Sequence, residues 1–268
     1  DIPFLPIQFF KSHEIKTGSW KDVKVFKSSG TTNNGRSAHL VEDLLFYHKG
    51  ARLFAEKYFG SLSDFEICAL LPSYHEQGNS SLIEMVNHFS SIALPESGFY
   101  HHREEELIHR LDNSTNTVLV FGVSYALVDL AKKVKKADWS RHIFVETGGM
   151  KGRKKEITRT QLHNTLSKAF GTDLIHSEYG MTELMSQAYG ANGVFKFPDW
   201  CQPMIRDIND PFSVSDQGSG GLNIIDLANT HSCAFIETED MANLIGNGSF
   251  EVLGRLDNSD IRGCSLLI

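Results

Sequence analysis

The chain has 268 residues, of which 41% are hydrophobic and 22% charged, and its formal net charge is −7. This hydrophobic content is enough for a real core, in one large α/β unit or in two smaller domains. The acidic balance offers no basic face for nucleic acid, no apolar run approaches the roughly 20 residues that cross a bilayer, and the first residues lack a signal-peptide layout. We therefore expect a cytoplasmic protein with no membrane span and no nucleic-acid partner.

The cysteines indicate a reducing environment. They are Cys68, Cys201, Cys233 and Cys264. Because they stand far apart with no paired spacing, the sequence argues against a zinc site or a disulfide framework, and reduced thiols are expected. The chain starts at Asp1 rather than at a methionine, so we also expect further sequence upstream.

The first informative segment in chain order is a hydroxyl-rich loop that follows the apolar alternation at residues 23–26. Its residues are Ser28, Ser29, Gly30, Thr31 and Thr32. A glycine lets backbone N–H groups approach an anion closely, and the hydroxyls add donors that rotate to suit phosphate oxygens. A helix expected from about Ser37 to Tyr58 would add the positive end of its dipole. The pattern predicts a phosphate-binding loop, with a simple solvated loop as the alternative.

Short apolar runs then recur between helical patterns, at residues 65–71, 117–122, 142–146, 174–176, 222–226 and 250–253. This rhythm predicts an α/β fold with a mainly parallel sheet in the first two thirds of the chain. Capping-box patterns at residues 81–84 and 158–161 predict helix starts. After about Phe195, Gly, Asp and Asn separate short strands. We expect an α/β core over residues 1–195 and a smaller β-rich subdomain over residues 196–268.

Three further motifs follow the loop in a fixed order: Tyr179-Gly180-Met181-Thr182-Glu183, Thr238-Glu239-Asp240 and Gly254-Arg255-Leu256-Asp257. Together with the loop, they resemble the core motifs of the adenylate-forming enzymes, which include the acyl- and aryl-CoA ligases. Segments at residues 71–75, 146–152 and 260–266 are most similar to the bacterial acyl-protein synthetases. The resemblance spans nearly the whole chain from Lys27 onward. It implies a large adenylation domain of the α/β class with a smaller β-rich subdomain, lacking the mobile C-terminal domain.

The resemblance implies ATP as a substrate and Mg²⁺ as its metal ion. The hydroxyl-rich loop, Ser28 to Thr32, would hold the β- and γ-phosphates. Thr182 would contact phosphate and Glu183 would ligate Mg²⁺, which prefers carboxylate and phosphate oxygens. The alternative for Glu183 is a surface carboxylate at a helix start, stabilised by the helix dipole.

The remaining nucleotide contacts are also implied by the resemblance. Asp240 would accept hydrogen bonds from the ribose hydroxyls, and Arg255 would be a second contact to ribose or phosphate. Their alternatives are a turn aspartate and a surface arginine. The residues implied around the adenine and its phosphates are Gly148, Gly149, Tyr179, Gly180 and Met181. For Tyr179, the alternative is a core tyrosine whose hydroxyl is satisfied.

His75 occupies the place where relatives shape the carboxylate pocket, so it would contact or wall off the acid. A structural hydrogen bond is the alternative for this histidine. The loop continues as Asn33-Asn34-Gly35-Arg36 and so lacks the glycine, proline and lysine that often follow it in the CoA ligases. The resemblance also implies a catalytic lysine in the mobile C-terminal domain, which is missing here. Either the basic run at residues 151–155 supplies that charge instead, or the enzyme is slow.

Cys264 matches the cysteine on which the acyl-protein synthetases carry the acyl group as a thioester. The neighbouring Arg262 lowers a thiol pKa and Gly263 gives mobility, so the local chemistry permits this role. A small buried hydrophobe is the alternative. Cys68, inside the apolar run at residues 65–71, is expected to be structural.

The sequence therefore predicts an ATP- and Mg²⁺-dependent enzyme that activates a carboxylic acid, of the fatty acyl-protein synthetase type, with an acyl-accepting protein as a partner. Two alternatives stay open. One is a minimal acyl- or aryl-CoA ligase related to phenylacetate-CoA ligase. The other is a non-catalytic adenylate-binding module that kept the fold and lost the chemistry. Retention of Glu183, Asp240 and Arg255 together speaks against this last alternative.

Overall fold

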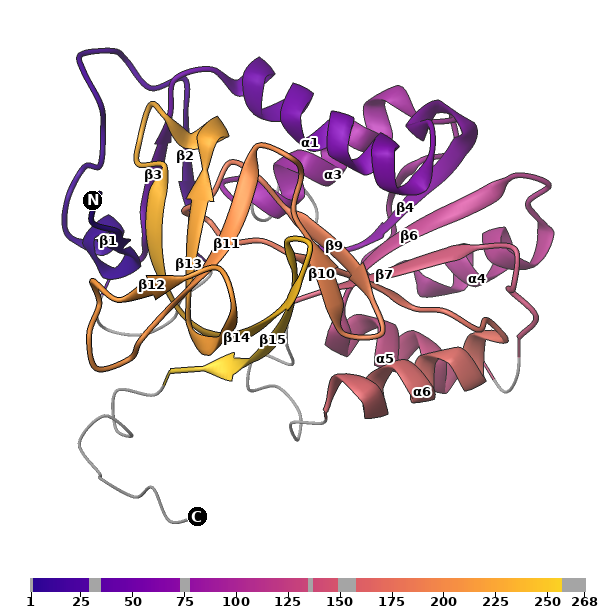
Figure 1. Ribbon diagram of the computed structural model, residues 1–268. Helices are drawn as coiled ribbons and strands as arrows, with labels where there is room; N and C mark the ends of the chain where they lie inside the picture. Colours follow the sequence, from indigo (N-terminus) through magenta and orange to yellow (C-terminus); the bar gives the residue numbers. More distant parts are fainter. Residues whose placement is uncertain (1, 29–34, 73–77, 135–136, 149–157, 257–268) are drawn as a thin grey trace, which may run out of the picture.

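The computed structural model describes residues 2–28, 35–72, 78–134, 137–148 and 158–256 (Figure 1). Its parallel strands lie in the order β8-β7-β6-β4-β5. They are β4 (Phe65–Leu70), β5 (Gly98–Phe99), β6 (Thr117–Val123), β7 (Ile143–Thr147) and β8 (His176–Tyr179). The predicted parallel sheet is confirmed, although its last strand begins at His176 rather than at Leu174. Buried apolar side chains on both faces of β4 and β6 are typical of a sheet covered by helices.

Helices cover both faces of this parallel sheet. They are α1 (Leu44–Phe59), α3 (Ser81–Ile92), α4 (Glu104–Asn113), α5 (Ser124–Lys133) and α6 (Arg159–Phe170). Figure 1 shows α1 and α3 over one face, with α5 and α6 over the other. Their buried side chains and those of the strands form the larger of two hydrophobic clusters. No helix in the described ranges is long and apolar enough to cross a membrane.

The C-terminal part of the described chain consists of antiparallel strands that continue the same sheet. They are β9 (Ala188–Ala191), β10 (Val194–Lys196), β11 (Cys201–Arg206), β12 (Val214–Ser215), β13 (Gly218–Asp226), β14 (Phe235–Gly246) and β15 (Ser249–Arg255). The short strand β1 (Leu5–Pro6) pairs with β14, so the indigo N-terminal segment lies against this region (Figure 1). A second hydrophobic cluster lies here. The expected β-rich texture is therefore present, whereas the boundary near residue 195 stays a prediction.

A correction concerns the segment after the hydroxyl-rich loop. The structure has a hairpin of β2 (Lys24–Lys27) and β3 (Ala38–Val41), so the expectation of one helix over residues 37–58 is wrong. His39 and Val41 are buried at alternate positions, which is the period of a strand. The helix α1 begins only at Leu44, where the Asp43 carboxylate accepts a hydrogen bond from the Phe46 N–H. The helix therefore does not directly follow the loop in the chain.

The predicted capping box at the start of α6 is confirmed. The Thr158 hydroxyl accepts from the Gln161 N–H at 3.2 Å, and the Gln161 side chain accepts from the Thr158 N–H at 3.2 Å. At α3, by contrast, the capping residue is Ser80 rather than Ser81. Both helices thus begin within one residue of the predicted start.

We expect Thr158→Ala to lower the free energy of unfolding by about 1 kcal/mol, because the Gln161 N–H loses the Thr158 hydroxyl as its acceptor. For a chain of this size the thermal midpoint should fall by roughly 2–4 °C. The control is Thr165→Ala in the same helix, whose hydroxyl donates to the Gln161 carbonyl without capping an end. If the thermal midpoint falls equally in both variants, the capping hydrogen bond does not contribute the expected stability.

Candidate functional site

The two ends of the hydroxyl-rich loop are fastened together beside Glu183. The Ser28 N–H donates to the Ser37 carbonyl at 3.1 Å, and the Ser37 N–H donates to the Ser28 hydroxyl at 3.0 Å. The Ser37 side chain also hydrogen-bonds the Glu183 carboxylate. Ser29, Gly30, Thr31 and Thr32 lie outside the described residues. The loop predicted to bind phosphate therefore leaves and re-enters the described structure next to the predicted metal ligand.

Glu183 is buried, with 6% of its surface exposed, and it lies in a turn. The alternative of a surface carboxylate at a helix start is therefore wrong. Burial raises the pKa of the Glu183 carboxyl, the Ser37 hydrogen bond and the charge of Lys11 lower it, and the nearby Glu239 raises it. Burial outweighs these contacts and a further hydrogen bond from the Glu183 backbone, so a cation beside this carboxylate would stabilise its charged form.

Tyr179, on β8, meets Asp240 and Arg255, which lie on the paired strands β14 and β15. The Tyr179 hydroxyl donates to Asp240 Oδ2 at 2.7 Å, and Arg255 Nε lies 3.7 Å from Asp240 Oδ1. Asp240 and Arg255 are partners across β14 and β15. Arg255 Nη2 also donates to Glu239 Oε2 at 2.8 Å, and burial raises the pKa of the Asp240 carboxyl. Glu239 thus pairs with Arg255 of this trio, and its charge also acts on Glu183.

Tyr179 is half-buried, with its ring packed against the rings of Phe195, Phe197 and Phe250. With its hydroxyl donated to Asp240, the tyrosine has the satisfied contacts of the structural alternative. Its role against adenine stays a prediction. Met181, two residues later, is partly buried against the cluster that includes these phenylalanines.

The two described glycines of the predicted site, Gly148 and Gly180, lie at the carboxyl ends of β7 and β8. A Cβ at Gly180 would stand 2.5 Å from Glu178 Oε1, so a larger residue here would displace the end of that side chain. Gly148 has φ +65°, a conformation that favours glycine, and its carbonyl accepts from the Ser124 hydroxyl. His75, Gly149, Cys264 and the basic run at residues 151–155 lie outside the described residues.

Sequence reasoning missed a buried polar cluster under Gly148. The Glu146 carboxylate accepts from Ser124 Oγ at 3.0 Å and from Ser177 Oγ at 2.8 Å, and Arg159 Nε lies 3.4 Å away. Burial raises the pKa of Glu146, but the contacts from His163, Ser177, Arg159 and Ser124 lower it below its usual value. The sequence signal that could have revealed this cluster was Glu146 itself, a charged residue inside an apolar run. The cluster ties the ends of β6, β7 and β8 together below the predicted nucleotide site.

Three further residues near Glu183 were missed, namely His39, Asp226 and Asn229. Each is buried and polar. They contact the backbone of Glu183 itself (Asn229), of the residue before it (His39) or of the residues shortly after it (Asp226). The only sequence signal was polarity at the end of the apolar run at residues 222–226. Since the contacts join segments about 40 to 190 residues apart, spacing along the chain could not reveal them.

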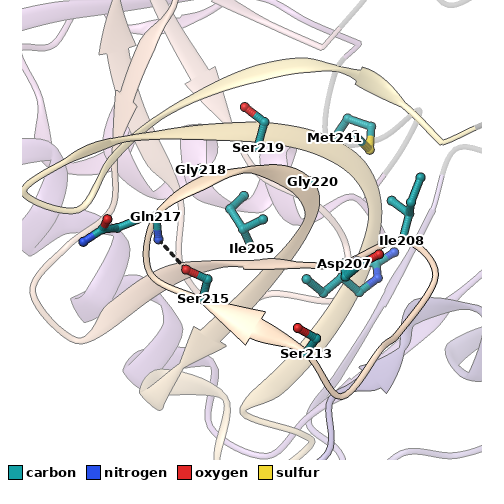
Figure 2. Close-up of a pocket in the computed structure, with 11 residues that line it drawn as sticks. Ile205, Asp207, Ile208, Ser213, Ser215, Gln217, Gly218, Ser219, Gly220 and Met241 are labelled. Carbon is teal, nitrogen blue, oxygen red and sulfur yellow. Dashed lines mark hydrogen bonds between the residues drawn. The ribbon is translucent and has the colours of Figure 1, made fainter. Parts of the chain in front are cut away.

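A pocket of about 370 Å³ lies elsewhere, among β11, β12 and β13 (Figure 2). Its walls include Ile205, Ser215 and Met241, and none of the predicted site residues lines it. Met241 follows Asp240 on β14, where successive side chains point to opposite faces of the sheet. The pocket is therefore separate from the residues around Glu183.

One group in the described part of the chain has the composition of a metal site. The ligand atoms of His101, His102 and Glu104 lie within 4.8 Å of one another at the start of α4. Lys133 Nζ lies 3.5 Å from Glu104 Oε2, so an ammonium already compensates the only carboxylate in this group. We assign no function to it.

Comparison with solved structures identifies the fold. ATP-bound MatB from Rhodopseudomonas palustris is similar over 89% of this chain and 49% of that chain, with a TM-score of 0.64 and 16% identity. O-succinylbenzoate coenzyme A synthetase (MenE) from Bacillus subtilis, in complex with AMP, is similar over 90% of this chain and 50% of that chain, with a TM-score of 0.61 and 18% identity. Coronafacic acid ligase from Pectobacterium brasiliense is similar over 79% of this chain and 43% of that chain, with a TM-score of 0.53 and 16% identity.

No protein-family model matches the chain, and no curated protein matches it significantly in sequence. The chain spans about half the length of MatB and MenE. Identities of 16–18% establish a common fold and nothing finer. The conclusion is that this chain has the α/β fold found in about half the length of these ligase and synthetase structures.

Proposed function

We propose that this chain forms the ATP-binding part of an enzyme that activates a carboxylic acid as an acyl-adenylate. The observation that carries the proposal is the meeting of three distant segments: the loop ends at Ser28 and Ser37, the turn at Glu183, and the Tyr179–Asp240 pair. Solved structures of similar fold contain ATP, in MatB, or ATP and a magnesium ion, in MenE. The fixed order of the sequence motifs supports the same assignment.

In this reaction a carboxylate oxygen of the acid attacks the α-phosphorus of ATP. The bond from that phosphorus to the oxygen bridging the β-phosphate breaks, and pyrophosphate leaves with the electron pair. No proton moves, so the site must supply alignment and charge neutralisation. In the proposed site, the hydroxyls of Ser28 to Thr32 donate to the β- and γ-phosphates and Thr182 contacts phosphate, while His75 borders the acid.

The residues around Glu183 fit a magnesium ion. Mg²⁺ binds one or two carboxylates together with phosphate oxygens, and Glu183 offers a buried carboxylate beside the proposed phosphate loop. Since burial raises the pKa of this carboxyl, a cation would stabilise its ionised form. The bound ion would supply charge neutralisation at the phosphate oxygens.

We expect Asp240→Asn to weaken ATP binding by roughly 1.5–3 kcal/mol, because a charged acceptor for the ribose hydroxyls is lost. The change conserves shape, and asparagine can still accept from the Tyr179 hydroxyl, so the fold should persist. Glu237→Gln is the matched control: it removes a charge from the same strand, where Glu237 lies 3.5 Å from Arg206. Calorimetry with Mg-ATP measures both variants. Equal affinity of Asp240→Asn and the unaltered protein would refute the ribose role.

The finer proposal is a fatty acid as substrate and the Cys264 thiol as the first acyl acceptor. In that step the thiolate attacks the acyl carbon, the bond from this carbon to the AMP oxygen breaks, and AMP leaves. The described cysteines are poor candidates. Burial raises the pKa of Cys68 to about 12 and raises that of Cys201 and Cys233 as well, so their thiolates are disfavoured.

Coenzyme A is the alternative acceptor, and the name of the similar MenE structure, a coenzyme A synthetase, favours it. Exchange of labelled pyrophosphate into ATP, run over a panel of carboxylic acids, tests the first step. Pyrophosphate exchange that depends on an acid supports adenylation. Adenylation is refuted if no acid in the panel gives exchange and the protein binds neither Mg-ATP nor a stable acyl-adenylate analogue. Thioester formation with and without coenzyme A then separates the two acceptors.

A further inference from the structure

The Glu183 turn, residues 182–186, is held by buried side chains that belong to distant parts of the chain. His39, on β3, is 1% exposed. Its Nδ1 donates to the Thr182 carbonyl at 2.8 Å, and its Nε2 lies 3.0 Å from Asn229 Oδ1. The ring of Phe10 stands edge-on to the imidazole, with centroids 5.8 Å apart. This histidine therefore holds the backbone of the predicted phosphate-contacting residue.

Asn229 holds the next peptide unit. It ends the short 3-10 helix η3 (Leu227–Asn229), is 1% exposed, and donates from Nδ2 to the Glu183 carbonyl at 2.8 Å. The same amide faces His39 with its oxygen. Two consecutive carbonyls, of Thr182 and Glu183, are thus fixed by one linked pair of side chains.

Asp226 holds the other end of the turn. Its carboxylate is fully buried and accepts from the Met185 and Ser186 N–H groups, each at 2.9 Å, and from the Ser186 hydroxyl at 2.7 Å. It also accepts from the Ala228 N–H at 3.1 Å, which fixes η3 itself. The segment that carries Asn229 is therefore anchored to the same turn that Asn229 holds.

The hairpin of β2 and β3 joins this arrangement to the loop. His39 lies two residues after Ser37, which closes the loop onto Ser28 and hydrogen-bonds the Glu183 carboxylate. One short strand thus sets the loop ends and the Glu183 turn relative to each other. A shift of about 1 Å between catalytic groups can lower a rate on the order of 100-fold, so such a connection has a direct consequence for catalysis.

We propose that His39 and Asn229 are positioning residues for adenylation, which aim Thr182 and Glu183 at the phosphates through the turn backbone. The inference rests on the proposed function. Neither side chain contacts substrate in this arrangement, since each is buried and faces the backbone or the other. A purely structural role predicts loss of stability and no change in the turnover of folded protein.

Two substitutions of His39 separate these roles. In His39→Asn the amide nitrogen takes the place of Nδ1 and can still donate to the Thr182 carbonyl. In His39→Gln the amide lies at the place of Nε2, so the contact with Asn229 survives and the Thr182 contact is lost. We expect pyrophosphate exchange by His39→Asn to stay within roughly tenfold of the unaltered enzyme, and kcat of His39→Gln to fall on the order of 100-fold.

Asn229→Asp is the second variant, because its carboxylate accepts from His39 but cannot donate to the Glu183 carbonyl. It should also lose kcat and need a higher Mg²⁺ concentration for half-maximal exchange. His142→Gln is the matched control. That buried histidine accepts from the Val118 N–H at 3.0 Å and has Nε2 2.9 Å from the Leu111 carbonyl, at the opposite ends of the parallel strands. It should lower the thermal midpoint and leave exchange per folded molecule unchanged.

The outcomes are distinct. An unaltered enzyme without exchange overturns the proposed function and this inference with it. An active enzyme whose His39→Gln and Asn229→Asp variants keep its kcat and Mg²⁺ requirement overturns the inference alone. The inference alone is also overturned if His39→Asn loses as much kcat as His39→Gln. It is overturned as well if neither the His39 variants nor Asn229→Asp fold, since these side chains would then serve the fold only.

Discussion

Replacing Glu183 by glutamine is expected to lower pyrophosphate exchange at ordinary Mg²⁺ concentration on the order of 100-fold or more. The substitution keeps the shape of a buried side chain, retains an oxygen that can accept from Ser37, and removes the charge proposed to hold the metal ion. Because burial already raises the pKa of this carboxyl, the neutral amide should cost the fold little. Exchange should recover partly at high Mg²⁺ concentration.

The control for burial is Glu66→Gln. Glu66 is 2% exposed, accepts from Ser114 and Asn116, and pairs with Arg110 at the amino end of β4. Since catalytic groups of a parallel sheet gather at the carboxyl ends of its strands, this variant should melt earlier yet exchange normally per folded molecule. If Glu183→Gln exchanges at the rate of the unaltered protein at ordinary Mg²⁺ concentration, the metal assignment is wrong.

Cys264→Ser is expected to abolish hydroxylamine-labile acyl labelling while leaving pyrophosphate exchange unchanged. Adenylate formation does not use the thiol, so only the second step should fail. A serine that accepts the acyl group would form an ester, which hydroxylamine cleaves far less readily. A labelled fatty acid with ATP, followed by intact mass and peptide mapping, distinguishes these products.

Cys233→Ser is the matched control, because Cys233 is the half-buried thiol of the three described and its Sγ lies 3.3 Å from the Phe235 carbonyl. Labelling should persist in that variant. A label that maps to Cys233 or Cys201, or that stays hydroxylamine-labile in Cys264→Ser, would contradict the thioester assignment while leaving adenylation in place. A label that forms only with coenzyme A present would favour the CoA-ligase alternative.

The sequence by itself determined the parallel sheet and several helix starts, because these depend on local patterns. The apolar runs at residues 65–71 and 117–122 became β4 and β6, and the pattern at residues 158–161 became a complete capping box. The sequence-based prediction of one helix over residues 37–58 was wrong, because the first part of this segment is the four-residue strand β3. Pairing with β2 decided that segment, and a window along the chain does not contain its partner.

At the candidate site, the sequence determined which chemical groups are present and in what order, since the segments that carry the hydroxyl-rich loop, Glu183 and Asp240 are each contiguous. Only the tertiary structure decided that Glu183 is buried beside Ser37, that Tyr179 donates to Asp240, and that His39 and Asn229 hold the turn. These contacts join residues separated by 46 to 146 positions. The physical reason is that burial and hydrogen bonding depend on distance in space, which the folded sheet sets and local sequence does not.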